Sequence, residues 1–383
     1  MARLGTTIEV MGDCDVVEAA RERIRWLLAE FEVVGASISG GKDSTIVLEL
    51  LLEEAQAAGR LPVPVLFVDQ EAEWQMVIDH VREVMHRPGV EPYWFQGPIK
   101  MSNSTSSFTD AAFLEAWAPG QEWMREREPD SIHVNETGKE RFHEMFGALY
   151  NQFWPGRKTV FIGGMRADES PRRRMGLCSA PQGKKQPWRG YHGRSWVKDE
   201  GRGHYTAWPI YDWSLSDVWQ QIAVNNWSYC PLYDWQYRYG IKDRAMRVSS
   251  LHHEMSVTFL RYLQAIEPET WTRLVKRLEG IDAEGKIGSQ TQIVSELPPM
   301  FVSWQAYRDY LLEEMIHDED RRRKMRDKFI WAEQYMENTT EKIQAALLKC
   351  EVQSIIRHDW DSELVYTFVT SHLQDRPAPL AAS

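Results

Sequence analysis

Short apolar runs alternate with amphipathic stretches along the first half of the chain. Four runs are rich in β-branched or aromatic side chains and predict buried strands. These runs are residues 33–38, 63–68, 93–95 and 159–163. Apolar positions at helical spacing predict helices over residues 15–31, 45–58 and 73–86. This alternation predicts an α/β fold with a doubly wound, mostly parallel sheet.

The second half of the chain has a different pattern. Residues 246–281 and 301–350 carry apolar positions at helical spacing and predict helices. We therefore expect an α/β domain over residues 1–240, followed by a helical C-terminal region over residues 241–374. The last residues, 375–383, are expected to form a disordered tail.

The composition is that of a soluble globular protein. Apolar residues make up 43% and charged residues 26% of the 383 residues, and no apolar run is long enough to span a bilayer. The sequence does not start with a basic-then-apolar signal peptide, so we expect a cytoplasmic protein that does not contact a membrane. The net charge of −11 argues against wholesale coating of nucleic acid but leaves room for a local basic site.

The cysteines exclude two common site types. Cys14, Cys178, Cys230 and Cys350 are widely spaced, and no Cys-x-x-Cys pair occurs. A zinc ribbon and a thioredoxin motif both require such pairs. We therefore expect buried thiols.

A glycine-containing hexapeptide joins the first predicted strand to the helix that follows. It is Ser39-Gly40-Gly41-Lys42-Asp43-Ser44. The two glycines permit positive φ and a close ligand approach, and the helix N-terminus favours a phosphate. Lys42 adds a positive charge, Asp43 or Ser44 is a candidate helix cap, and Asp43 is a candidate Mg²⁺ ligand. The alternative is an ordinary Gly-Gly turn with a capped helix. The pattern is not a Walker loop.

Asp69 directly follows the second predicted strand. Ligands of open parallel sheets bind at the carboxyl ends of strands, so Asp69 is a candidate contact for a ribose hydroxyl or a metal. The alternative is that it caps the helix predicted over residues 73–86.

Two segments interrupt the α/β pattern. Residues 111–150 form an inserted, partly helical segment of unreadable function, and residues 166–205 form a basic, glycine-rich loop. From Arg166 to Arg202, ten Lys and Arg residues face four Asp and Glu residues. Arginines bind phosphate or sulfate through paired hydrogen bonds, so this loop predicts a site for a multiply charged anion. The tryptophans between these basic residues could stack on bases, so a nucleic-acid substrate is a second possibility. The other alternative is a solvated basic loop without a ligand.

Three motifs occur in a fixed order and carry a family resemblance. They are the loop at 39–44, Gly-x-Arg-x-x-Glu-Ser-x-x-Arg at 164–173, and Pro-Ile-x-x-Trp-x-x-x-Asp-Val-Trp at 209–219 with Pro-Leu-Tyr at 231–233. The first resembles the pyrophosphate-binding loop (PP-loop) of the N-type ATP pyrophosphatases. Together they resemble the phosphoadenosine phosphosulfate (PAPS) reductase and ATP-sulfurylase small-subunit family, over roughly residues 15–240. Residues 67–74 and Arg244-Ala245-Met246-Arg247 are similar to the immunoglobulin-binding-regulator type of PAPS-reductase-like proteins.

The resemblance implies a nucleotide-binding domain over residues 1–240 and a role for each motif residue. The residues that it implies for binding ATP or PAPS and a small anionic substrate are Ser39, Gly40, Gly41, Lys42, Asp43, Ser44, Asp69, Gly164, Arg166, Glu169, Arg172 and Arg173. Lys42, Asp43 and Arg166 would be catalytic, and Asp43 would hold Mg²⁺. The implied enzyme splits ATP between the α- and β-phosphates, adenylates an anionic acceptor (sulfate, a sulfonucleotide or nucleic acid) and releases pyrophosphate.

Two alternatives stay open. A PAPS or sulfonucleotide reductase needs a reactive thiolate, for which Cys178 in the basic loop is the candidate. Cys350 lacks the Glu-Cys-Gly-type motif of true reductases, and no iron–sulfur cluster is expected. The other alternative is a nucleotide-dependent regulator or nucleic-acid-binding protein that acts with a ParB-like partner. A homo-oligomer also stays open.

Overall fold

The structure is a computed structural model of the chain. It describes residues 15–105, 113–178, 190–191, 194–278, 281, 296–316, 318–356 and 359–373. The chain forms two compact units, the first made of residues 1–100 and 115–248 and the second of 101–114 and 249–383. Residues 241–248 therefore belong to the α/β unit and not to the helical region that we expected to begin at 241. The predicted tail lies outside the described residues.

A seven-stranded sheet with the order β3-β2-β1-β6-β9-β8-β7 is the centre of the first unit, among its described residues. Its parallel strands are β1 (Val33–Ser37), β2 (Val63–Val68), β3 (Val90–Phe95), β6 (Thr159–Ile162) and β9 (His204–Ala207). At one edge β8 (Arg194–Gly201) and β7 (Gly190–Tyr191) continue the sheet antiparallel. Four strands lie where the apolar runs predicted them, so the mostly parallel α/β sheet is confirmed.

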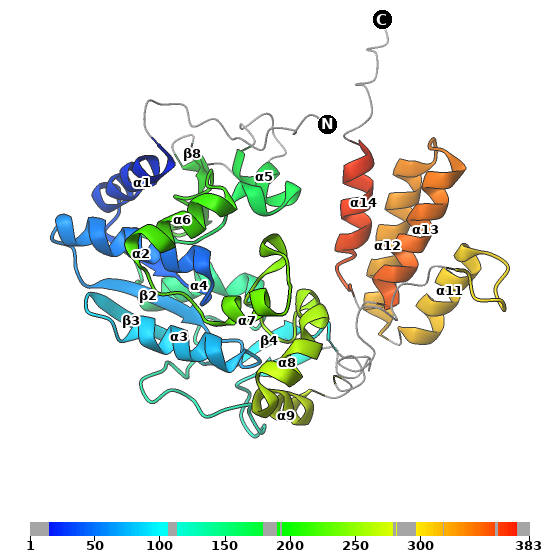
Figure 1. Ribbon diagram of the computed structural model, residues 1–383, viewed down its shortest axis with the longest axis horizontal. Coiled ribbons are helices and arrows are strands. Elements are labelled where there is room, and N and C mark those ends of the chain that lie inside the picture. Colours follow the sequence, from blue (N-terminus) through cyan, green and yellow to red (C-terminus); the bar gives the residue numbers. More distant parts are fainter. Residues whose placement is uncertain are drawn as a thin grey trace, which may run out of the picture. The chain divides into compact units, whose positions relative to one another are not determined.

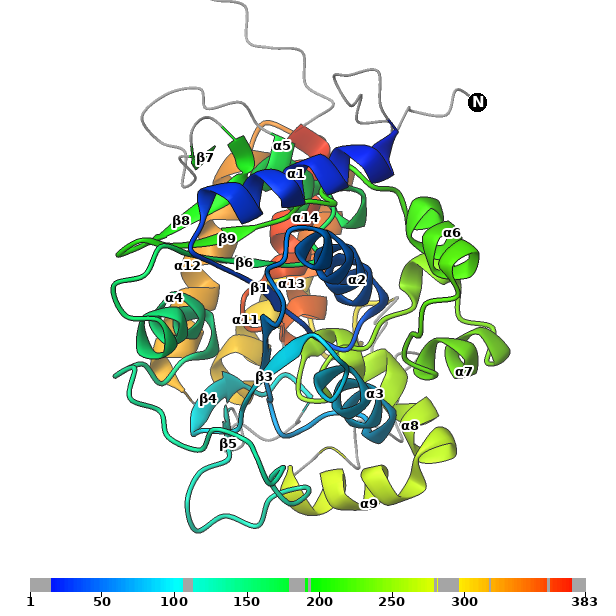
Figure 2. The same cartoon turned by 90° about the vertical axis from the view of Figure 1, so that its left-hand side faces the viewer.

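Helices cover both faces of this sheet. The helices of this unit include α1 (Val16–Glu30), α2 (Lys42–Ala57), α3 (Gln75–Met85) and α4 (Phe142–Phe153), together with α6 (Leu215–Asn225), which packs on α2, and α7 (Leu232–Arg238). Figure 2 shows α2 and α3 on one side of the sheet and α4 on the other, which is the doubly wound arrangement. All six residues of β2 are buried, as a strand covered on both faces requires.

The segment 166–205, predicted as a loop, contains regular structure. A 3₁₀ turn, η2 (Ala167–Glu169), leads into α5 (Pro171–Cys178), and β7, β8 and β9 follow. Trp196 and Val197 are buried in β8. Charged residues follow them directly, so β8 does not contain an apolar run from which a strand could be predicted. Residues 179–189 and 192–193 lie outside the described part of the chain.

Part of the predicted insertion at 111–150 covers the end of β2. It includes β5 (Phe113–Ala116), which pairs with β4 (Ile99–Ser102), and the start of α4. Trp117 donates from Nε1 to the carbonyl oxygen of Asp69 at 2.8 Å, and its backbone N–H donates to Glu71 Oε2 at 2.9 Å. The insertion is thereby tied to the residues that follow β2.

The second unit is helical, as predicted. Its elements are η4 (Glu254–Phe259), α8 (Leu260–Ile266), α9 (Pro268–Arg277), α11 (Trp304–Met315), α12 (Glu319–Met336), α13 (Glu341–Ile356) and α14 (Glu363–Leu373). The last four, labelled in Figure 1, share one core that includes Leu312, Phe329 and Val352. Within the described ranges of the chain, no helix is long and apolar enough to cross a membrane.

Candidate functional site

The loop between β1 and α2 has a conformation that glycine makes possible. Gly40 has a φ of 72°, in the left-handed region. A β-carbon there would lie 2.7 Å from Val77 Cγ1, so this turn cannot hold a larger residue unchanged. The backbone N–H of Ser39 donates to Ser44 Oγ at 3.2 Å and closes the turn. The structure therefore has the strand–turn–helix arrangement that the hexapeptide predicts.

The N-terminus of α2 is not capped as we expected. Its N-cap residue is Gly41, which has no side chain to accept a hydrogen bond. Ser44 Oγ donates to the Gly41 carbonyl oxygen at 2.9 Å, and the Asp43 carboxylate accepts from two cations instead of from backbone amides. An N-cap residue without a side chain leaves first-turn N–H groups to acceptors from elsewhere: Lys42 N–H donates to the Tyr233 hydroxyl at 3.3 Å, and the next N–H groups suit an anion.

Three residues predicted to be catalytic meet at this helix end. Lys42 Nζ lies 2.9 Å from Asp43 Oδ2, and Arg166 Nε lies 2.6 Å from Asp43 Oδ1. The Arg166 side chain is only 4% exposed and also donates from Nη1 to the carbonyl oxygen of Trp213 at 3.4 Å. One carboxylate thus holds two cations, one from each of two motifs far apart in sequence.

Gly164 explains how the second motif approaches the loop. A β-carbon at this position would lie 2.5 Å from the carbonyl carbon of Asp43 and 2.6 Å from Ser44 N. Real β-carbons do not approach backbone atoms so closely, so only glycine lets the segment after β6 pack against the first turn of α2. This contact delivers Arg166, two residues later, to Asp43.

The remaining residues of the second motif are held by hydrogen bonds and ion pairs to one another. Glu169 Oε1 accepts from the backbone N–H of Arg166 at 2.8 Å, and the other oxygen pairs with Arg173. In this arrangement both carboxylate oxygens of Glu169 have partners within the motif, so Glu169 positions Arg166 and Arg173. The side chains of Arg172 and Cys178, both on α5, lie outside the described part of the structure.

Asp69 has a different environment from the predicted one. It is fully buried, and its carboxylate accepts from Trp94 Nε1 at 2.8 Å, from Gln96 Nε2 at 2.9 Å and from Arg125. The backbone N–H of Glu71 donates to it as well, at 2.9 Å. No exposed oxygen is left for a ribose or a metal, and α3 begins six residues later, at Gln75, without an Asp69 cap. Asp69 therefore braces the end of β2.

Tyr233 is a site residue that sequence reasoning did not find. The backbone N–H of Lys42 donates to its hydroxyl at 3.3 Å, and Lys42 Nζ lies 5.3 Å from the centre of its ring. Burial, with the nearby Asp43 charge, raises the pKa of the phenol, so it stays protonated. The Pro-Leu-Tyr motif marked this residue, but no local pattern places it against a loop 191 positions earlier.

Asp43 is the candidate metal ligand at this site. Among the described residues there is no group of three His, Cys, Asp or Glu side chains able to hold a metal. Asp43 is the carboxylate at the loop, and its side chain is 18% exposed. Mg²⁺ commonly takes one or two carboxylates and fills its remaining positions with water and substrate phosphates. Asp43 fits that mode, provided that a nucleotide supplies the other ligands.

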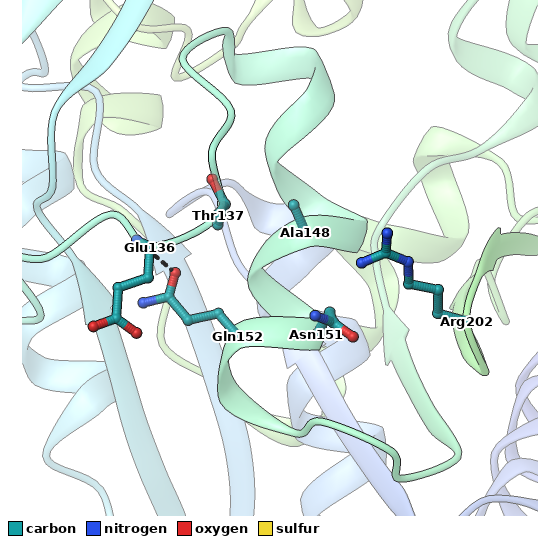
Figure 3. A pocket seen from close by; sticks show the side chains of 6 residues that line it. All are labelled: Glu136, Thr137, Ala148, Asn151, Gln152 and Arg202. Atoms are coloured by element: carbon teal, nitrogen blue, oxygen red, sulfur yellow. Dashed lines mark hydrogen bonds between the residues drawn. The ribbon is translucent and has the colours of Figure 1, made fainter.

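A separate hollow lies on another part of the first unit. It is lined by Glu136, Thr137, Ala148, Asn151, Gln152 and Arg202. Figure 3 shows Asn151 between the side chains of Glu136 and Arg202, with Gln152 accepting a hydrogen bond from the Glu136 backbone at 3.1 Å. None of the predicted site residues lines it, so it is distinct from the loop site.

Comparison with family models divides the chain into two matched segments. Residues 34–239 match a model described as the phosphoadenosine phosphosulfate reductase domain. Residues 240–368 match a model described as a domain of unknown function, DUF3440. The first segment contains both the PP-loop and the Gly164–Arg173 motif.

The chain is also similar to individual proteins. An uncharacterized protein of Escherichia coli K12, YbdN, is 32% identical over 318 residues, which cover 79% of this chain and 75% of that protein. Sulfate adenylyltransferase subunit 2 of Vibrio vulnificus YJ016 is 24% identical over 216 residues, which cover 55% of this chain and 63% of that protein. A phosphate complex of PAPS reductase from Candida auris aligns over 64% of this chain and 98% of that chain, with 14% identity and a TM-score of 0.31.

Proposed function

Because the chain belongs to the phosphoadenosine phosphosulfate reductase domain family, we propose that it uses ATP to adenylate an anionic acceptor. The observation that carries this proposal is the cluster of Lys42, Asp43 and Arg166 at the uncapped N-terminus of α2. Two cations and a helix N-terminus at one point suit a leaving group as highly charged as pyrophosphate.

The proposed reaction is a displacement at the α-phosphorus. An acceptor oxygen forms a bond to that phosphorus, the bond to the bridging oxygen breaks, and pyrophosphate leaves with the electron pair. The loop amides and Lys42 hold the β- and γ-phosphates. Arg166 stabilises the negative charge that develops on the phosphate oxygens in the transition state. An acceptor that is already an oxyanion needs no general base.

Mg²⁺ would be held by Asp43 and by the phosphates, and it would offset the negative charge of pyrophosphate. The ion pairs of Asp43 with Lys42 and Arg166 keep its carboxylate at the loop. Sulfate is the first acceptor to test, because several relatives are sulfate adenylyltransferase subunits. Sulfonucleotides and nucleic-acid phosphates follow.

The test is pyrophosphate release from ATP and Mg²⁺ by the full chain. The wild type would be compared with Asp43→Ala, without acceptor and then with sulfate, DNA or RNA. Asp79→Ala is the matched control, because Asp79 is a carboxylate with a 55% exposed side chain on α3. We expect release to fall about 100-fold in Asp43→Ala, the size typical for loss of a charged group at a reacting centre. Absence of release in every mixture, with ATP still bound, would overturn the proposal.

Two other functions would give different results in this assay. A sulfonucleotide reductase would consume PAPS without releasing pyrophosphate from ATP, and it would lose activity in Cys178→Ser. A nucleotide-dependent regulator acting with a ParB-like or nucleic-acid partner would bind nucleotide without turnover, and its nucleic-acid binding would weaken steeply with salt.

A further inference from the structure

The segment that follows α7 lies against the PP-loop. A β-carbon on Gly41 would lie 3.2 Å from Val248 Cγ2 and 3.4 Å from the hydroxyl of Tyr233. Both residues are in the first unit, and Val248 belongs to the stretch matched by the domain of unknown function. The first residues of that domain are therefore neighbours of the proposed pyrophosphate site.

The backbone of Arg247 is fixed in this place by a buried amide. Arg247 N–H donates to Gln236 Oε1 at 3.0 Å, and Gln236 Nε2 donates back to the Arg247 carbonyl oxygen at 2.7 Å. Gln236 is on α7 and only 1% exposed. The same short helix carries Tyr233, which touches Lys42. One helix thus carries Tyr233, which contacts the loop, and Gln236, which fixes the backbone of Arg247, the residue before Val248.

The charge of Arg247 lacks a counterion in the described part of the chain. Its one side-chain hydrogen bond goes from Nε to the carbonyl oxygen of Ala245, at 3.4 Å. Burial and the positive charge of Arg173 both lower the pKa of its guanidinium. Glu169 is the nearby acid, but it already accepts from Arg166 and pairs with Arg173. A half-buried cation next to another cation is costly unless an anion is bound.

We infer that Arg247 binds a tetrahedral oxyanion in the proposed site, either a phosphate group of the nucleotide or a free sulfate. The inference rests on the proposed function, and it assigns part of the domain of unknown function to nucleotide or acceptor recognition. A guanidinium suits this ligand because its planar fork donates two parallel hydrogen bonds to adjacent oxygens. Gln236 is then a positioning residue.

Calorimetric binding tests the inference without relying on turnover. Inorganic pyrophosphate would be titrated into the full chain, and sulfate into the chain saturated with pyrophosphate, for the wild type, Arg247→Ala and Arg247→Lys. Arg238→Ala is the control, since Arg238 is an exposed arginine of α7 that stacks on Trp235. Arg247→Ala should weaken one of the two anions about 10- to 100-fold, the loss expected for a charged hydrogen bond. Arg247→Lys should give a smaller loss.

The two titrations also separate the sources of the oxyanion. Weaker pyrophosphate binding assigns Arg247 to the nucleotide phosphates, and weaker sulfate binding alone assigns it to the acceptor. The inference would be overturned if Arg247→Ala bound both anions with affinities within twofold of the wild type. It would also be overturned if neither the wild type nor any variant bound either anion. If the wild type releases no pyrophosphate from ATP but Arg247 still governs anion binding, the proposed reaction fails and the anion site stands.

Discussion

Arg166 donates to Asp43 across 123 residues of sequence, with Nε 2.6 Å from Oδ1. The pair joins the residue after the PP-loop lysine to the segment after β6, and β6 is the direct neighbour of β1 in the sheet. Adjacent parallel strands bring their carboxyl ends to one edge, and that is why two distant motifs form one site.

Replacing Asp43 by asparagine tests the balance of charge at the loop. The substitution leaves Lys42 and Arg166 without the carboxylate that both contact. Without Mg²⁺, the affinity for inorganic pyrophosphate should therefore rise, by about fivefold or more. Mg²⁺-dependent pyrophosphate release should fall at the same time. Calorimetry and the release assay measure the two effects, with Asp79→Asn as the control, and weaker pyrophosphate binding would contradict the charge argument.

The hydroxyl and the ring of Tyr233 have separable effects. Tyr233→Phe keeps the ring beneath the Lys42 ammonium but removes the acceptor of the Lys42 backbone N–H. That amide then becomes available to a phosphate, so pyrophosphate should bind at least as tightly as in the wild type. Tyr233→Leu also loses the cation–π contact, worth about 0.5–2 kcal/mol, and should bind pyrophosphate several-fold more weakly. Equal affinities of the two variants would show that the ring does not position Lys42.

Gly164 and Gly163 form a matched pair for testing the packing of the second motif. Alanine at 164 would place its β-carbon 2.5 Å from the backbone of Asp43, whereas alanine at 163 would lie 3.6 Å from Trp208, an ordinary contact distance. Gly164→Ala should therefore lower the free energy of unfolding by about 1–3 kcal/mol and reduce pyrophosphate release, while Gly163→Ala should do neither. Chemical denaturation measures the change in the free energy of unfolding, and the release assay measures the change in pyrophosphate release. Similar behaviour of the two variants would contradict the steric argument.

A buried carboxyl in the second unit should make stability depend on pH. Glu351 of α13 is fully buried, and its Oε2 lies 2.7 Å from Nη1 of Arg308 on α11. Burial raises the pKa of this carboxyl from its ordinary 4.5 to about 7, because the loss of hydration outweighs the attraction of Arg308. Between these two values the folded chain binds more protons than the unfolded chain. The stabilisation is present at low pH and is lost as the pH rises through about 7.

The free energy of unfolding should accordingly fall by on the order of 1–3 kcal/mol more for the wild type than for Glu351→Gln between pH 5 and 8. Denaturant unfolding at both pH values measures this difference. Glu333→Gln is the control, because Glu333 contacts the same Arg308 from a 39% exposed position. Parallel pH profiles of the wild type and Glu351→Gln would refute the assignment.

Much of the fold could be predicted from the local pattern of residues. β2 is fully buried and β1 is buried at four of its five residues, so both contain apolar runs, and the turn at Gly40 needs a residue that tolerates positive φ. Both properties depend on immediate neighbours in the chain, so they can be predicted without knowing the sheet order. β8 escaped prediction because its buried residues, Trp196 and Val197, stand beside Lys198, Asp199 and Glu200.

The interaction partners of each site residue could be identified only from the tertiary structure. Sequence alone determined the strand–PP-loop–helix unit, the family motifs and the helical character of the second half. Only the fold decided that Asp69 is buried by Trp94 and Arg125, and that Tyr233 and Val248 reach the loop. The physical reason is that hydrogen-bonding capacity belongs to each side chain, but its partner depends on strand order and on helix packing, which no local pattern encodes.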